Sequence, residues 1–208
     1  MVQTQSLTFS YPNSKEIQLP DLQCSAGEAV LVLGASGSGK TTYLQLLAGL
    51  RKLQSGSISI NGQDLGSMEG KDLDKFRGKN IGLVFQQSHF IPSVTVYENL
   101  VLSRSLAKLP PDKNLIENYL KQLNIDHKSD SYPKHLSVGE QQRLSIVLAL
   151  VNQPKVILAD EPTSALDDEN ANQVIELMKK EAKRLSSALI IVTHDQRMKN
   201  HFTNQVWL

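Results

Sequence analysis

The sequence has little of several features that would each point to a particular environment or partner. A single cysteine, Cys24, among 208 residues excludes an intramolecular disulfide and is typical of a reducing compartment. Lysine plus arginine number 22 and aspartate plus glutamate number 21, so no long-range field attracts nucleic acid or an anionic membrane. We therefore expect no nucleic-acid partner.

Long apolar runs are also lacking. The longest, at 144–151, falls well short of the roughly 20 residues that a membrane-spanning helix requires. The first residues, MVQTQ, lack the basic start and apolar middle of a secretory signal peptide. We therefore expect a cytoplasmic protein, and any position at a membrane would depend on a partner.

What the sequence does contain is a glycine-rich stretch between an apolar run and a predicted helix. Residues 34–41 read GASGSGKT and fit the P-loop pattern G-x-x-x-x-G-K-[ST]. The preceding run, 29–33, predicts a buried strand, and residues 42–50 predict a helix. Both flanks therefore agree with the strand, loop and helix that the motif requires.

The order of these elements suits the binding of nucleotide phosphates. Gly34, Gly37 and Gly39 lack Cβ, so the backbone can adopt left-handed angles and approach a ligand. Successive N–H groups then form an anion site at the positive end of a helix. The lysine adds a cation for the β- and γ-phosphates, and the following threonine hydroxyl can ligate Mg²⁺. The predicted nucleotide-binding residues are Gly34, Ala35, Ser36, Gly37, Ser38, Gly39, Lys40, Thr41 and Thr42.

Three other apolar runs are followed directly by polar side chains, at the position where the P-loop follows its own strand. These side chains are Gln86, the pair Asp160 and Glu161, and His194. Because parallel strands end at one edge of a sheet, where ligands bind, we expect these side chains to converge on the phosphates.

Asp160 follows four apolar residues, which is the Walker B pattern. Its carboxylate can hold Mg²⁺ beside Thr41. Glu161 is placed to orient or deprotonate the attacking water. The alternative, an ordinary turn at the end of a strand, is disfavoured because a P-loop occurs in the same chain.

Around these motifs, the pattern predicts an antiparallel start and a helical middle. Residues 3–11 and 17–24 predict paired strands, and Asn61-Gly62 predicts a hairpin turn after a strand at 57–60. The charged segment 66–78 is expected on the surface. Two helices are predicted, from about 94 to 109 and at 113–123. The stretch 136–143 is predicted to open a third, which continues to 151.

Together the motifs resemble those of the nucleotide-binding subunits of ATP-binding cassette (ABC) transporters. The most specific piece is LSVGEQ at 136–141, which fits the signature Leu-Ser-x-Gly-x-Gln. The order and spacing of the motifs agree over essentially the whole chain. Ala159 and the stretch YPKH at 132–135 resemble the lipoprotein-release and macrolide-export branch.

The resemblance implies an α/β fold, a P-loop NTPase (RecA-like) core with an N-terminal antiparallel β-subdomain and an inserted α-helical subdomain. Residues 1–208 would form one ABC ATPase domain, with the core at about 1–87 and 152–208 and the helical subdomain at about 88–151. The implied activity is hydrolysis of ATP with Mg²⁺, coupled to a separate transmembrane permease that exports or extrudes its cargo. The protein would lie peripherally at the cytoplasmic face of the membrane, paired head to tail with a second cassette, most simply an identical one.

The resemblance also implies roles for single residues. Tyr11 would stack on adenine, Gln86 would reach Mg²⁺ and the attacking water, and His194 would contact the γ-phosphate. The signature residues would bind the γ-phosphate held by a second cassette, and Asp167 would lie in the D-loop crossing that dimer interface. Taken singly, each has an ordinary explanation as a strand, turn or cap residue. The signature residues concerned are Ser137, Gly139 and Gln141.

Two residues depart from the family pattern. Val138 replaces a common glycine in the signature, and Leu148 replaces a frequent arginine in the following helix. Neither is in the P-loop or Walker B motif, so we expect an active hydrolase. The alternatives are a soluble ATPase that acts on nucleic acid or ribosomes, and a degenerate regulatory cassette. The apolar segment 88–97 predicts either a groove for a permease helix or packing between subdomains.

Overall fold

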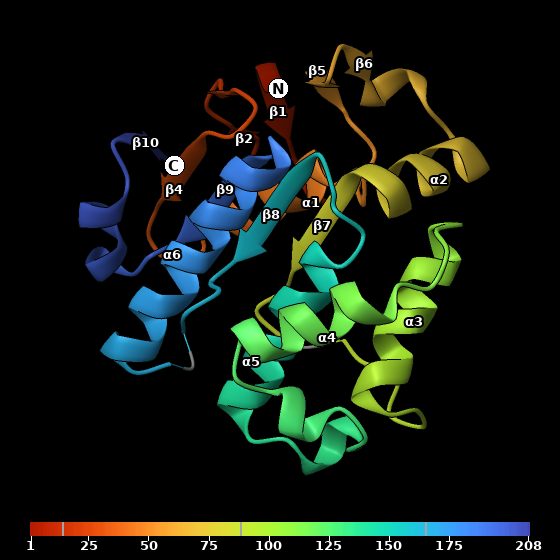
Figure 1. Cartoon of the computed structure of the whole chain (residues 1–208). Coiled ribbons are helices and arrows are strands. Elements are labelled where there is room, and N and C mark those ends of the chain that lie inside the picture. Colours follow the sequence, from red (N-terminus) through yellow and green to blue (C-terminus); the bar gives the residue numbers. More distant parts are fainter. Residues whose placement is uncertain (14, 88, 165) are drawn as a thin grey trace.

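The computed structural model describes residues 1–13, 15–87, 89–164 and 166–208, and it contains two five-stranded sheets. The first sheet is antiparallel and has the order β2-β1-β5-β6, with β3 also paired to β1 (Figure 1). Its strands are β1 (Val2–Phe9), β2 (Ile17–Gln18), β3 (Gln23–Cys24), β5 (Ser55–Ile60) and β6 (Gln63–Asp64).

The predicted hairpin turn at Asn61-Gly62 is confirmed. These two residues join β5 to β6 with φ angles of 50° and 78°. Left-handed angles at both central positions match the twist of the flanking strands, which is why Asn-Gly is favoured there. The antiparallel start of the chain therefore follows directly from local turn chemistry.

The second sheet is parallel and has the order β10-β4-β9-β8-β7. The strand β10 was not predicted, because NQVW has no clear apolar run and lies at the sheet edge with both ends exposed. By contrast, every residue of β8 and β9 is buried. The strands are β4 (Ala29–Leu33), β7 (Ile81–Val84), β8 (Val156–Asp160), β9 (Ala188–Thr193) and β10 (Asn204–Trp207).

The helices lie on both faces of the parallel sheet and between its strands in sequence. The segment 66–78 is largely exposed, as expected, but most of it is helical in α2, whose only buried residue is Phe76. The α-helices are α1 (Lys40–Leu47), α2 (Gly70–Asn80), α3 (Val96–Leu106), α4 (Lys113–Gln122), α5 (Val138–Leu150) and α6 (Asp168–Leu185). The 3₁₀ helices are η1 (Leu65–Ser67), η2 (Asp126–Lys128), η3 (Pro133–His135) and η4 (Gln196–His201).

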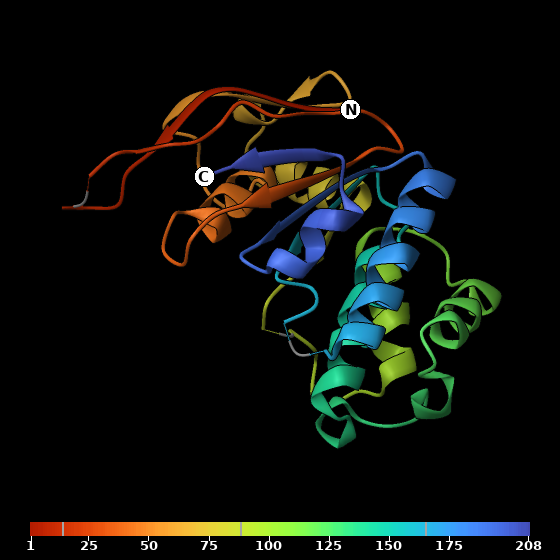
Figure 2. The same ribbon diagram turned by 90° about the vertical axis from the view of Figure 1, so that its left-hand side faces the viewer.

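Side chains of the parallel sheet alternate between two hydrophobic cores. Val30 and Val32 pack with the antiparallel sheet and α1, whereas Leu31 and Leu33 pack with α3, α4, α5 and α6. Figure 2 shows this layering, with the antiparallel sheet above the parallel strands and the helices from α3 to α6 below them. Because both faces are covered, the carboxyl edge of the parallel sheet is left for a site.

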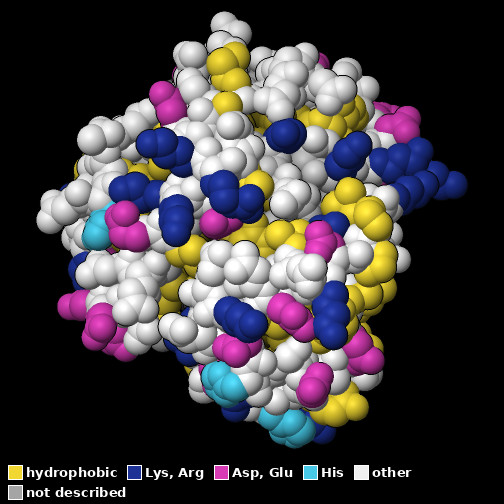
Figure 3. Space-filling model, in the orientation of Figure 1, with side chains coloured by type: hydrophobic (Ala, Val, Ile, Leu, Met, Phe, Trp, Pro, Cys, Tyr) yellow, Lys and Arg dark blue, Asp and Glu magenta, His cyan; other side chains and the backbone are white. Residues whose placement is uncertain are grey.

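No helix in the described ranges is long and apolar enough to cross a bilayer. Acidic and basic side chains are interspersed over most of the face drawn in Figure 3.

Candidate active site

A cavity of about 350 Å³ opens at the carboxyl edge of the parallel sheet. Its lining comes from the loops that follow β4, β7, β8 and β9, together with two residues near the antiparallel sheet. The structure therefore brings together sequence-predicted residues that are up to 183 positions apart, as the parallel topology requires. Those in the lining are Tyr11, Ser36, Gly37, Gly39, Lys40, Thr41, Thr42, Gln86, Asp160, Glu161 and His194.

The three P-loop glycines are needed for different reasons. Gly37 and Gly39 adopt left-handed angles, with φ of 80° and 102°, and Gly39 is the N-cap of α1. Gly34 has no such angle, contrary to the expectation for it. A Cβ at Gly34 would overlap Ser38 Oγ and lie 3.1 Å from a backbone oxygen of Leu208, so this glycine provides space. Ala35 and Ser36 are exposed at the tip of the loop.

Lys40 and Thr41 begin α1 and extend toward the loop and Walker B residues. The Lys40 ammonium donates to the carbonyl oxygens of Gly34 and Ala35, each at 2.8 Å, which places a mostly buried cation across the loop. Thr41 Oγ1 donates to Asp160 Oδ2 at 2.8 Å. Burial raises the pKa of the Asp160 carboxyl, and the hydrogen bond from Thr41 opposes that shift.

Glu161 is fixed by contacts to both oxygens of its carboxylate and has an unusual backbone angle. Its backbone is left-handed, with φ of 50°, which is unusual for a residue with a side chain. Glu161 Oε2 accepts from Thr193 Oγ1 at 2.5 Å. Glu161 Oε1 accepts from the backbone N–H of His194 at 3.0 Å and lies 2.6 Å from His194 Nδ1. The carboxylate and the imidazole are thus paired at the cavity wall.

Tyr11 and Thr42 meet at the other end of the cavity. The Tyr11 hydroxyl lies 2.7 Å from Thr42 Oγ1, and the ring packs edge-on against Phe9 with centroids 5.1 Å apart. The Arg51 guanidinium lies 5.0 Å from the centre of the Tyr11 ring. Tyr11 as a whole is 38% exposed and contributes to the cavity lining. The Gln86 side chain lies exposed in the lining.

The signature residues lie outside this cavity. Ser137 is the N-cap of α5, and it forms a capping box with Glu140 through bonds of 3.3 Å and 2.7 Å. Val138 is next in the chain and is 67% exposed, and Gly139 follows it in the first turn. Gln141 turns back to donate to the Leu136 carbonyl at 3.2 Å. Ser137 and Val138 are exposed at this helix start, and neither contributes to the described lining of the P-loop cavity.

Asp167 is likewise absent from the lining. It is the N-cap of α6 and accepts from the Asn170 N–H at 2.9 Å. This bond lowers the pKa of the Asp167 carboxyl. Ala165, two positions earlier in the chain, lies outside the described residues.

Sequence reasoning missed two residues at the site. Ile17 contributes to the cavity lining and lies against the P-loop, where a Cβ on Gly39 would approach its Cγ2 to 3.3 Å. Thr193, at the end of β9, donates a hydrogen bond to the Glu161 carboxylate. The available signal was a hydroxyl at the end of an otherwise apolar strand, directly before the predicted His194.

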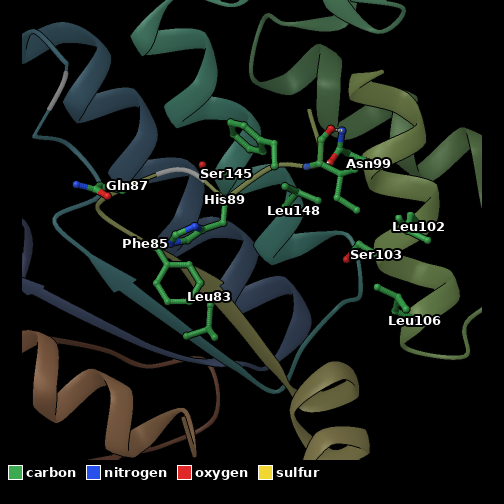
Figure 4. A pocket seen from close by; sticks show the side chains of 12 residues that line it. Leu83, Phe85, Gln87, His89, Asn99, Leu102, Ser103, Leu106, Ser145 and Leu148 are labelled. Atoms are coloured by element: carbon green, nitrogen blue, oxygen red, sulfur yellow. Dashed lines mark hydrogen bonds between the residues drawn. The ribbon is translucent and has the colours of Figure 1, made fainter. Parts of the chain in front are cut away.

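A second hollow of about 250 Å³ lies between the end of β7, α3 and α5 (Figure 4). Leu148 on α5 faces Leu102 and Leu106 on α3 across it. The predicted segment 88–97 contributes residues from 89 to 91, while residue 88 lies outside the described ranges. Asn99 secures this segment, since it accepts from the Ile91 N–H at 2.9 Å and donates to the Ile91 carbonyl at 3.2 Å.

The comparisons with known proteins agree with this geometry. The family model described as "ABC transporter" matches residues 17–164. The bacitracin export ATP-binding protein BceA of Halalkalibacterium halodurans is 37% identical over 84% of this chain and 70% of its own length. The lipoprotein-releasing system ATP-binding protein LolD 1 of Chlorobium luteolum is 38% identical over 94% of this chain and 88% of its own. The chain therefore belongs to the ABC transporter family.

Solved structures confirm the predicted fold. A dimeric structure of MJ0796, described as a bacterial ABC transporter cassette, has a TM-score of 0.91 at 30% identity. It covers 100% of this chain and 94% of that one. A structure of the same cassette bound to ADP and Pi, described as a post-hydrolysis state, also has a TM-score of 0.91, at 31% identity. The class of molecule is thus an ATP-binding cassette ATPase.

Proposed function

We propose that two copies of this chain bind two ATP molecules head to tail and hydrolyse them to drive a separate membrane permease. The observation that carries the proposal is the division of the site. The P-loop, Asp160, Glu161 and His194 share one cavity, whereas the exposed signature turn at 137–139 lies outside it. A second copy would supply the missing side of each nucleotide.

The described side chains fit a triphosphate and its metal. Lys40 and the N–H groups at the start of α1 would neutralise the β- and γ-phosphates. Thr41 Oγ1 and Asp160 Oδ2, already 2.8 Å apart, are hard oxygen ligands of the kind that Mg²⁺ prefers. When bound, Mg²⁺ would neutralise negative charge on the phosphate oxygens.

Hydrolysis requires a water molecule aligned with the γ-phosphate. Glu161 would orient that water and accept its proton, because its carboxylate is fixed at the cavity wall. His194 would contact the γ-phosphate and Gln86 would approach from the β7 loop, since both side chains line the same cavity. Tyr11 would stack on the adenine ring at the far end.

In the dimer, Ser137, Gly139 and Gln141 would complete the site of the partner from the start of α5. Asp167 would contribute at the same interface from the start of α6. ATP would stabilise the closed dimer because its γ-phosphate contacts both copies, and hydrolysis would release those contacts.

The apolar hollow between α3 and α5 would receive a helix of the permease. Ile91 and Leu106 at its edge are 41% and 75% exposed, and Leu148 makes its floor apolar. Such docking would place the protein peripherally at the cytoplasmic face of the membrane. The export and lipoprotein-releasing relatives support an exporter or extruder as the partner. Neither they nor the balanced charge favour the nucleic-acid alternative.

The test is the substitution Glu161→Gln, with Glu117→Gln on the exposed face of α4 as a matched control. We expect Glu161→Gln to bind ATP with unchanged affinity and to lose at least about 100-fold in phosphate release, the scale of general-base assistance. The control is expected to hydrolyse ATP normally. Undiminished phosphate release by Glu161→Gln would refute the catalytic assignment, and a wild-type protein without turnover would indicate the degenerate cassette.

A further inference from the structure

Thr193 ends β9 and is fully buried, although the rest of that strand is apolar. A buried hydroxyl is costly unless it is hydrogen-bonded, so its partners matter. Thr193 Oγ1 donates to Glu161 Oε2 at 2.5 Å and accepts from the backbone N–H of Asp195 at 3.0 Å. One hydroxyl therefore joins the loop that carries Glu161 to the turn that carries His194.

The other oxygen of the Glu161 carboxylate is held from the same strand end. Glu161 Oε1 accepts from the His194 N–H at 3.0 Å and lies 2.6 Å from the imidazole. With the hydroxyl on Oε2, both oxygens are fixed, and the carboxylate cannot rotate about its last bond without breaking a contact. The backbone is fixed as well, because the Glu161 N–H donates to the Val192 carbonyl at 2.9 Å.

We propose that Thr193 is a positioning residue for hydrolysis, one that sets the orientation of the Glu161 carboxylate and anchors the His194 turn. The inference rests on the proposed function, in which that carboxylate aligns the attacking water. Thr193 is fully buried and does not contribute to the described lining of the nucleotide cavity, so its influence on the reaction passes through Glu161 and His194.

This assignment predicts a separation of kinetic constants. The P-loop and Tyr11, which would hold the nucleotide, have residues in the cavity lining and Thr193 does not, so the KM for ATP should stay within about twofold. The rate of the bound complex depends on the alignment of Glu161. Small misplacements of catalytic groups cost up to about 100-fold, so we expect kcat to fall between about 10-fold and 100-fold.

The experiment compares Thr193→Val, which keeps the shape and removes the hydroxyl, with Thr193→Ser, which keeps the hydroxyl. The matched control is Thr4→Val. Thr4 is another buried strand threonine, and its Oγ1 accepts a backbone N–H from Leu22 at 2.8 Å and lies 3.2 Å from the Tyr43 hydroxyl. Both valine variants remove the hydroxyl acceptor of one backbone N–H, that of Asp195 or that of Leu22, but only Thr193 is at the site. ATP hydrolysis and thermal unfolding are measured for all of them.

We expect Thr193→Val to lose kcat as stated, Thr193→Ser to recover to within about threefold of wild type, and Thr4→Val to keep its kcat despite lower stability. If Thr193→Val keeps wild-type kcat, or if serine does not restore it, the inference is wrong. Should valine prevent folding, Thr193→Ala and Thr193→Ser give the same comparison. Failure of this inference can be distinguished from failure of the proposed function, because in the second case Glu161→Gln would retain ATP turnover.

Discussion

Gly34→Ala perturbs the P-loop in a way that the backbone angles do not reveal. The added methyl would overlap Ser38 Oγ and lie 3.1 Å from a backbone oxygen and the Cβ of Leu208. Ser38 Oγ is buried and has no hydrogen-bond partner among the described residues, so it can turn away without losing a bond. The Leu208 backbone offers less room, and the loop must shift by a few tenths of an ångström.

The expected magnitude follows from this geometry. Overpacking typically costs about 1–3 kcal/mol, and each 1.4 kcal/mol of lost binding energy is about a tenfold change in affinity. Because the strain falls on the loop that would hold the phosphates, we expect the Kd for ATP to rise roughly 10-fold. Removing the hydroxyl with Ser38→Ala in the same chain relieves the shortest contact. The Kd of the double variant for ATP should therefore recover to within about threefold of the Kd of Ser38→Ala alone.

The assay is fluorescent-nucleotide titration of four proteins, namely wild type, each single variant and the double variant. Ser38→Ala alone is the reference for the double variant, because Ser38 is itself a predicted nucleotide-binding residue and its Oγ has no hydrogen-bond partner among the described residues. If the double variant binds as weakly as Gly34→Ala, the contact with Ser38 is not the cause. If Gly34→Ala binds ATP with wild-type affinity, the P-loop accommodates the added methyl group without strain, and the reasoning from its packing is wrong.

Three further outcomes test other parts of the structure. Gly82→Ala would place a methyl group against the Ala149 carbonyl and within 2.9 Å of Pro154. Chemical denaturation should therefore show a loss of about 3 kcal/mol in the free energy of unfolding. Gly78→Ala, whose added methyl group has 3.8 Å of clearance, should show no such loss. Burial raises the pKa of Cys24 from 9.0 to about 11 and that of Tyr43 from 10.0 to about 12. As pH rises, the unfolded chain therefore loses these protons before the folded protein does. The free energy of unfolding should be unchanged below pH 9 and fall as pH rises toward 12, less steeply in Cys24→Ala. A urea midpoint that stays constant from pH 8 to pH 11 would contradict this prediction. Leu106→Glu should reduce stimulation by the permease at least 10-fold with basal hydrolysis unchanged, and full stimulation would exclude the α3–α5 hollow as the docking groove.

The sequence carried the buried part of the fold well. The apolar runs of the strands β8 and β9 and the Asn61-Gly62 hairpin turn are each encoded by a few adjacent residues. The strand β10 and the helix α2 were missed because neither has an apolar periodicity. β10 is held by its pairing with β4, and α2 buries only Phe76. Long-range contacts stabilise both elements, and no local pattern reports them.

For the site, motif spacing together with the rule for parallel sheets predicted which side chains converge. The remainder could not be predicted, because it depends on distances. The left-handed backbone of Glu161, the space needed at Gly34 and the dual role of the Thr193 hydroxyl arise from packing between segments that are far apart in sequence. The separation of the signature turn from the P-loop cavity within one chain agrees with what the family resemblance implied.

In the proposed dimer, each nucleotide lies between the P-loop of one chain and the signature turn of another. Sedimentation of Glu161→Gln with ATP tests it directly, alone and combined with Val138→Glu or with Leu106→Glu. Both added charges replace exposed apolar side chains, but only Val138 lies at the signature. We predict an ATP-dependent dimer for Glu161→Gln and for its Leu106→Glu combination, and a monomer for the Val138→Glu combination, because the new carboxylate would face the γ-phosphate. A strictly monomeric Glu161→Gln protein at high concentration with ATP and permease, or a dimer indifferent to Val138→Glu, would contradict the account.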